Sequence, residues 1–157
     1  MTGVLMVKIA FYKGNSSTAW NNFWANAVRW WTGGPYSHTE VITKTDETGK
    51  HLCYSSTIKE HGVRGEWRVL PESDWDFVDV DSDPEAVTAW FEDKIKQGCK
   101  YDMLGLLGFL FKRQEFDKNK YFCSEAVADS IGIREGWRYD PNDLKPIVDL
   151  LSQYTRK

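Results

Sequence analysis

The order of its secondary-structure signals constrains this chain most: strand-type stretches dominate its first half, and helix-type segments dominate its second half. The strand-type stretches are rich in β-branched and aromatic residues and are bounded by turn-forming Gly, Pro, Asn and Asp residues. They cover residues 4–12, 37–43, 51–58, 63–70 and 75–80. The last four predict an antiparallel meander in the middle of the chain.

Helical spacing of apolar residues, together with start and stop signals, predicts helices beside and after these strands. The predicted helices cover residues 18–31, 84–97, 122–130 and 141 onward. Ser16 or Ser17 would cap the first helix, the Gly33-Gly34-Pro35 turn would end it, and Asp102 could cap the apolar segment 103–111. Strands beside helices indicate a single α+β domain over the whole chain (1–157), with a central antiparallel sheet packed against helices.

The chain is rich in aromatic residues, with 8 Trp, 7 Tyr and 8 Phe. One aromatic and apolar stripe follows helical spacing on the first predicted helix: Trp20, Phe23, Trp24, Ala27, Val28 and Trp31. This stripe has two interpretations, core packing or the wall of a substrate cleft. The last predicted helix has a second stripe, which we expect to be buried: Leu144, Ile147, Val148, Leu150 and Leu151.

Composition argues against several classes of protein. The 157 residues suffice for one hydrophobic core, and the formal net charge of −3 gives no basic surface for a nucleic acid. The longest apolar run, residues 103–111, is about half the length that crosses a membrane. The first ten residues lack the apolar stretch and cleavage site of a signal peptide. We therefore expect no nucleic-acid partner, no membrane span and a cytoplasmic location.

The three cysteines are Cys53, Cys99 and Cys123. Their odd number and wide spacing argue against a disulfide framework, and the absence of a Cys-x-x-Cys pair argues against structural zinc. No metal or organic cofactor is therefore expected. Cys53 lies within a predicted strand and Cys99 follows a helix stop, so both are interpreted as packing residues.

Cys123 lies where an extended aromatic segment turns into a helix. A thiol in the first turn of a helix faces the positive end of the helix dipole and the unpaired backbone N–H groups there, which favour its thiolate form. The same N–H groups can stabilise a developing oxyanion. From its position alone, Cys123 is either a nucleophile or a packed residue on the inner face of the helix.

His38 begins a predicted strand directly after a Gly-Gly-Pro turn, a place where side chains line clefts. Glu40 is two residues further on and therefore points to the same face of the strand. A carboxylate in that position could orient the imidazole and raise its basicity, as the third member of a catalytic triad does. The alternative is an exposed strand face with ordinary polar residues.

Several motifs follow one another in a recognisable order: Ser37-His38-Thr39-Glu40, Tyr54-Ser55-Ser56, Gly62-Val63-Arg64, Lys100-Tyr101-Asp102 and Tyr121-Phe122-Cys123-Ser124-Glu125. In this order they resemble the circularly permuted papain-like hydrolases of the NlpC-type amidase and peptidase superfamily, in the YiiX-like and YaeF-like branch. The chain is also similar to small members encoded by phages and prophages. The resemblance extends from about residue 8 to residue 131, with the histidine before the cysteine as in permuted members.

The resemblance implies a papain-like fold in which Cys123 is the nucleophile and His38 is the general base that later protonates the leaving group. In several relatives the third polar residue lies on the next strand, near Ser55 here. Glu40 on the histidine's own strand is the alternative that we prefer, because a carboxylate orients an imidazolium better than a hydroxyl does. Tyr101-Asp102 is interpreted as structural, and Glu125 as bracing the start of its helix.

These inferences lead to the hypothesis of a cysteine hydrolase that cleaves an amide through an acyl-enzyme, with thioester or ester cleavage and acyl transfer as variants. The resemblance implies peptide-like or acylated substrates, such as peptidoglycan peptides or lipid-like acyl groups, and for a phage protein a place in the host cytoplasm or the virion. The rival hypothesis is a non-catalytic peptide- or glycan-binding or virion-associated module on the same fold.

Overall fold

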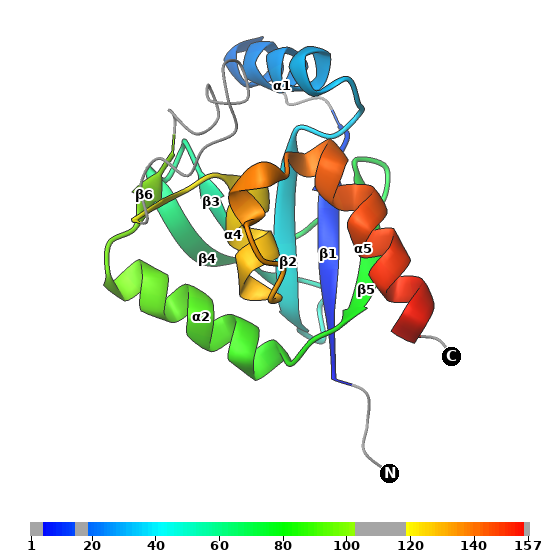
Figure 1. The fold of residues 1–157 in the computed structure, drawn as a ribbon, viewed down its shortest axis with the longest axis vertical. Helices are drawn as coiled ribbons and strands as arrows, with labels where there is room; N and C mark the ends of the chain where they lie inside the picture. Colours follow the sequence, from blue (N-terminus) through cyan, green and yellow to red (C-terminus); the bar gives the residue numbers. More distant parts are fainter. Residues whose placement is uncertain (1–4, 15–18, 103–118, 156–157) are drawn as a thin grey trace.

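A computed structural model describes residues 5–14, 19–102 and 119–155, and it confirms a mixed α+β architecture (Figure 1). A seven-stranded sheet has the strand order β5-β1-β2-β3-β4-β6-β7. Its strands are β1 (Met6–Tyr12), β2 (His38–Thr45), β3 (His51–Thr57), β4 (Gly62–Arg68), β5 (Trp75–Asp81), β6 (Lys100–Tyr101) and β7 (Lys120–Tyr121). Neighbouring strands run antiparallel except for the short β6–β7 pair, which is parallel.

The described helices are α1 (Ala19–Thr32), α2 (Pro84–Lys96), α4 (Cys123–Ser130) and α5 (Pro141–Thr155), with a short 3₁₀ turn, η1 (Gly136–Arg138). The start and stop signals act as expected on α2. The Asp83 carboxylate accepts the backbone N–H of Glu85 at 2.9 Å, and Gly98 follows with a φ of +68°. Gly33, with a φ of +67°, likewise ends α1. The predicted caps Ser16 and Ser17 and the apolar segment 103–111 lie outside the described residues.

The predicted meander is correct for β2, β3 and β4 but wrong for the strand that follows. Strand β5 does not pair with β4; it crosses to the other edge of the sheet and pairs antiparallel with β1, with Val7 opposite Val80. Alternation of residue types marks β5 as a strand but is silent about its partner. Because β1 and β5 extend the sheet on that side, β2 lies inside the sheet and not at its edge. Strand β1 is its neighbour on one side and β3 on the other.

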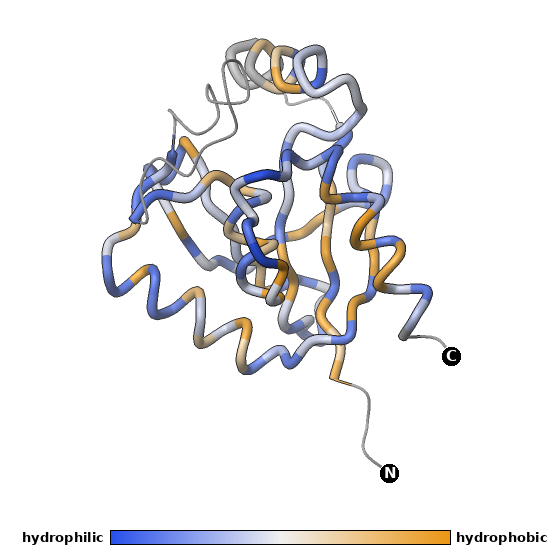
Figure 2. The backbone as a smooth tube through the Cα atoms, viewed as in Figure 1, coloured by the Kyte–Doolittle hydropathy of each residue, from blue (hydrophilic) through white to orange (hydrophobic). Residues whose placement is uncertain are grey.

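The two faces of the sheet have different surroundings. One face packs against α2, α4 and α5, and its core includes Phe11, Val41, Phe91, Val127 and Leu144, each with no exposed surface. Figure 2 shows hydrophobic positions gathering where β1 and β5 meet α5. The opposite face holds a smaller apolar cluster of Ala10, Ile42, Cys53, Leu70 and Trp75. Residues that alternate with the main core therefore point toward this second face, and His38 and Glu40 are among them.

Helix α1 lies across one end of the sheet and does not fill its core (Figure 1). Phe23 is 62% exposed and Trp31 is 44% exposed, so core packing is the wrong interpretation for these two members of the aromatic stripe. Val28, from the same stripe, lines a pocket. The side chains of Trp20 and Trp24 are outside the described part of the chain. Helical spacing finds an apolar face but cannot say whether a sheet lies beneath it.

The stripe of the last helix is correct in its first part only. Leu144 and Val148 are completely buried against the sheet, but Leu150 is 53% exposed and Leu151 is 38% exposed. Ser152, further along α5, is again buried, so the buried face of the helix follows Leu144, Val148 and Ser152 at every fourth residue and leaves Leu150 and Leu151 beside it. Among the described residues, no helix is long and apolar enough to cross a bilayer.

Gly65 offers a test of how β4 is fixed against the core. A Cβ at this position would overlap the ring of Tyr54, which stacks on Phe91 with ring centroids 5.2 Å apart and donates a hydrogen bond to Glu92. We expect Gly65→Ala to lower the free energy of unfolding by about 1–3 kcal/mol, the usual effect of overpacking. In a Tyr54→Leu background the same substitution should cost less than about 0.5 kcal/mol, because the obstacle is gone. Urea denaturation of the four proteins measures this coupling, and equal effects in both backgrounds would contradict it.

Candidate active site

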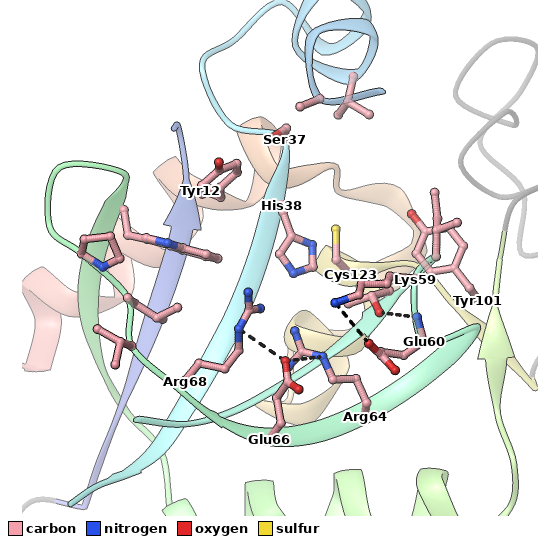
Figure 3. Close-up of a pocket in the computed structure, with 18 residues that line it drawn as sticks. Tyr12, Ser37, His38, Lys59, Glu60, Arg64, Glu66, Arg68, Tyr101 and Cys123 are labelled. Carbon is pink, nitrogen blue, oxygen red and sulfur yellow. Dashed lines mark hydrogen bonds and ion pairs between the residues drawn. The ribbon is translucent and has the colours of Figure 1, made fainter. Parts of the chain in front are cut away.

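The structure brings Cys123 and His38 together at one end of the sheet. Cys123 is the first residue of α4, and His38 is the first residue of β2, so both predicted positions are confirmed. The imidazole of His38 and the thiol of Cys123 lie close enough for the thiol to raise the pKa of the imidazole, although 85 positions separate the two residues in the chain. Figure 3 shows the sulfur and the imidazole side by side in one pocket. Their catalytic roles remain predictions at this point.

The start of α4 is held in place by side chains that do not line the pocket. The Glu125 carboxylate accepts the backbone N–H of Phe122 at 3.3 Å, just before the helix, as its interpretation as a brace predicts. Ser124 donates its hydroxyl proton to the backbone carbonyl of Tyr139 at 2.8 Å. Phe122 itself is extended (φ −91°, ψ 171°) and almost completely buried. Cys123 therefore enters the pocket from a rigid turn between a strand and a helix.

Glu40 takes the third position of the arrangement. Its Oε1 atom lies 3.0 Å from Nε2 of His38, which leaves Nδ1 as the ring nitrogen available to the thiol. Ser55, the other candidate, has its hydroxyl on the backbone carbonyl of Thr39 at 2.7 Å. The geometry thus places the carboxylate against the imidazole and uses the serine to tie β3 to β2.

Two arginines from β4 hold the Glu40 carboxylate. Arg64 donates to both carboxylate oxygens, with 2.9 Å between Nη1 and Oε2, and also contacts the backbone carbonyl of Cys53 at 3.3 Å. Arg68 donates from Nη1 to Oε1 at 2.6 Å. Glu66 lies between the two arginines on the same strand face and pairs with the Nε atoms of both. Two carboxylates and two guanidinium groups therefore balance in charge beneath the imidazole.

The charges in this cluster move two pKa values far from their ordinary positions. Burial alone raises the pKa of Glu40, but hydrogen bonds and charges from His38 and Arg64 outweigh it and lower the pKa to about 2. Burial alone lowers the pKa of His38, but Cys123 and Glu40 outweigh it and raise the pKa to about 9. At neutral pH the imidazole is therefore protonated while it faces the Cys123 side chain.

The pair opens into a pocket of about 650 Å³ between β4, the β4–β5 loop, α1 and β6 (Figure 3). One wall is apolar and includes Val69, Leu70, Pro71 and Trp75. The Trp75 ring meets the imidazole edge to face, with centroids 6.2 Å apart, and limits its rotation. The opposite wall carries Ile58, Lys59 and Glu60 beside Tyr101.

Tyr101 was expected to be purely structural, and the structure places its side chain in the pocket wall near Cys123. Burial, followed by the neighbouring Cys123 and Asp102, raises the pKa of its hydroxyl, so Tyr101 is a neutral hydrogen-bond donor at all physiological pH values. The remaining cysteines fit their interpretation as packing residues. Cys53 and Cys99 are buried and not joined in a disulfide, and burial above all raises the pKa of the Cys53 thiol to about 12.

Comparisons with models of known protein families and with curated proteins found no match to this chain. In the described ranges, no three His, Cys, Asp or Glu side chains gather in a way that could hold a metal ion.

Sequence reasoning did not recognise the role of Arg64, Glu66 and Arg68. They alternate on β4 as Arg-x-Glu-x-Arg, and alternation on a predicted strand places all three on one face. Charged residues at every second position of a predicted strand are the signal that could have identified this cluster. Their partner was not predictable, because Glu40 reaches them across the intervening strand β3.

The pKa of Glu40 leads to a prediction about stability at acid pH. Because folding lowers this pKa from 4.5 to about 2, the contribution of Glu40 to stability is complete above pH 4.5 and is lost as the pH falls through about 2. We expect the wild type to lose about 3 kcal/mol of unfolding free energy in this interval that a Glu40→Gln variant does not lose. The half-exposed Glu66 is the matched control, and Glu66→Gln should retain most of the wild-type slope. Chemical denaturation between pH 2 and pH 5 measures all three; parallel curves for the wild type and Glu40→Gln would refute the assignment.

Proposed function

We propose that this protein is a cysteine hydrolase that cleaves an amide bond through an acyl-enzyme on Cys123. The observation that carries the proposal is the position of the His38 imidazole, between the Cys123 thiol on one side and the Glu40 carboxylate on the other. A nucleophile, a base and a group that orients the base form the minimum set for covalent acyl transfer. The thiol also lies at the start of a helix, where the dipole favours its anion.

In the first half of the reaction, the Cys123 sulfur attacks the carbonyl carbon of the amide. Negative charge develops on the carbonyl oxygen, and the first-turn N–H groups of α4 at Cys123 and Ser124, which have no acceptor within the helix, can stabilise it. Protonated His38 gives its proton to the amine as the carbon–nitrogen bond breaks. A thioester on Cys123 and a neutral imidazole remain.

In the second half, a water molecule attacks the thioester carbon while neutral His38 accepts its proton. The carbon–sulfur bond breaks, the carboxylic acid leaves, and the thiolate and imidazolium are restored. If an alcohol or amine takes the place of water, the same steps transfer the acyl group. Glu40 keeps the imidazole oriented throughout and does not take the proton.

We further propose a relationship to the circularly permuted papain-like hydrolases. Support comes from the order of the site in the chain, with the histidine on an early strand and the cysteine at the start of a later helix, packed on an antiparallel sheet. The motif residues Arg64 and Glu125 also have defined contacts around that site. A peptide-like or acylated substrate fits a pocket of this volume with one apolar wall and one mixed wall.

Alkylation by iodoacetamide at pH 7 tests the nucleophile. All three cysteines are largely buried, but Cys123 is the one among the residues that line the pocket. We therefore expect one rapidly labelled cysteine, identified by peptide mass spectrometry as Cys123. Cys123→Ser should remove the rapid labelling. His38→Gln should slow it by about tenfold or more, because the imidazolium that stabilises the thiolate is lost. Cys53→Ala and Cys99→Ala are the matched controls and should label at the wild-type rate.

A second experiment tests the chemistry with p-nitrophenyl acetate. A burst of p-nitrophenol accompanied by a 42-Da increase on Cys123 is expected. If Cys123 is alkylated rapidly but no acetyl adduct forms on it, the hydrolase proposal is contradicted. Binding of muropeptides or acylated peptides without turnover would then favour the rival binding module.

A further inference from the structure

The Glu40 carboxylate receives more donors than its role toward His38 requires. Its Oε1 atom alone faces His38 Nε2, Arg64 Nη2 and Arg68 Nη1, and its side chain has no exposed surface. The two arginines differ in how they are bound. Arg64 is 11% exposed, grips both carboxylate oxygens and is anchored on the backbone of β3. Arg68 is 36% exposed and makes one bond to the carboxylate, while both arginines line the pocket.

This difference matters because His38 has two opposite tasks in the proposed reaction. It must be protonated to release the amine, and it must be neutral to activate water. In the acyl-enzyme the sulfur is part of a thioester and carries no charge, so Glu40 is the negative group that still holds a proton on the imidazole. A buried carboxylate bound only to His38 would hold that proton strongly and would slow the second half of the reaction.

We propose that Arg64 and Arg68 are positioning residues for His38: Arg64 fixes the Glu40 carboxylate in place, and Arg68 shares its charge, so that the imidazole can release its proton in the acyl-enzyme. The inference rests on the proposed function. Arg64 fits its part because a planar guanidinium that grips both oxygens allows the carboxylate only one orientation. Arg68 suits its role because its single hydrogen bond to Glu40 brings positive charge to the carboxylate without further fixing the carboxylate's orientation.

The charged and titratable groups around His38 come from five elements. Glu40 shares β2 with His38, and the others are Tyr12 on β1, Arg64, Glu66 and Arg68 on β4, Tyr101 on β6 and Cys123 on α4. The turn between β3 and β4 adds Lys59 and Glu60 in the opposite wall of the pocket. Replacing Cys123 with alanine removes any charge from this position. In that respect the variant resembles the acyl-enzyme, whose sulfur is uncharged. In a Cys123→Ala background, the titration of His38 reports on Glu40 and its arginines.

The experiment is an NMR titration of the histidine rings in the Cys123→Ala protein, which has only three histidines to assign. We expect Arg68→Met to raise the pKa of His38 by at least about half a unit, because one positive charge beside Glu40 is lost. Arg68→Lys should restore the pKa to within about 0.2 units, since charge is what this position supplies. The control is Arg138→Met, because the guanidinium of Arg138 pairs with Glu135 at the surface. This variant should leave the titration of His38 unchanged.

At position 64, unlike position 68, lysine should not replace arginine. Arg64→Lys keeps the charge but loses the two-oxygen grip, so the downfield, slowly exchanging Nε2–H signal of His38 bound to Glu40 should disappear. A merely structural role for either arginine would lower the melting temperature and leave both NMR readouts unchanged. That result would overturn the inference.

A kinetic readout separates this inference from the proposed function. With p-nitrophenyl acetate at pH 7, Arg68→Met should retain the burst but slow the second phase by about threefold or more, as the neutral fraction of His38 falls. If the wild type gives no burst, the proposed function fails, and the NMR titration still decides the roles of the arginines. If the burst is present and Arg68→Met leaves both the second phase and the titration unchanged, only the inference about the arginines fails.

Discussion

A carboxylate without any exposed surface is the constraint on which the rest of this site depends. Removing an ionised Glu from water costs several kcal/mol unless hydrogen bonds and opposite charges replace its hydration. Glu40 has these replacements on both oxygens, from two arginines and one histidine. Its charge is therefore retained inside the protein, and its orientation is set by the strand on the far side of β3. Because the His38 imidazole is hydrogen-bonded to Glu40, the orientation of the carboxylate also sets the orientation of the imidazole.

This dependence explains why the sheet has the register that it has. Strand β4 must present three alternating charged residues to the same face on which β2 presents His38 and Glu40. A shift of one residue in β4 would turn Arg64 and Arg68 toward the helices and would leave Glu40 without its cations. The other face of β4 fixes the same register by packing, because the Tyr54 ring fits only over Gly65. Packing on one face and ion pairing on the other therefore select a single alignment.

The cysteine reaches the site by a separate route. Helix α4 packs on β2 and β3, and its first residue projects past the end of the sheet toward the start of β2. The two reactive groups thus lie on different elements whose relative position is set by the main core, while the second face of the sheet sets the orientation of the imidazole. A site built at the end of a sheet keeps its reactive groups rigid and leaves the space above them open to a ligand.

The sequence by itself determined the local part of this protein. Alternation and turn residues identified β1 to β5, a capping residue identified the start of α2, and the spacing His-x-Glu placed both side chains on one face. Each of these signals depends on neighbours in the chain. Only the tertiary structure decided that β5 joins β1, that Phe23 and Trp31 are exposed, and that Arg64 and Arg68 meet Glu40. Those outcomes depend on which elements lie side by side, and the energy of a buried ion pair or an apolar face exists only once its distant partner is in place.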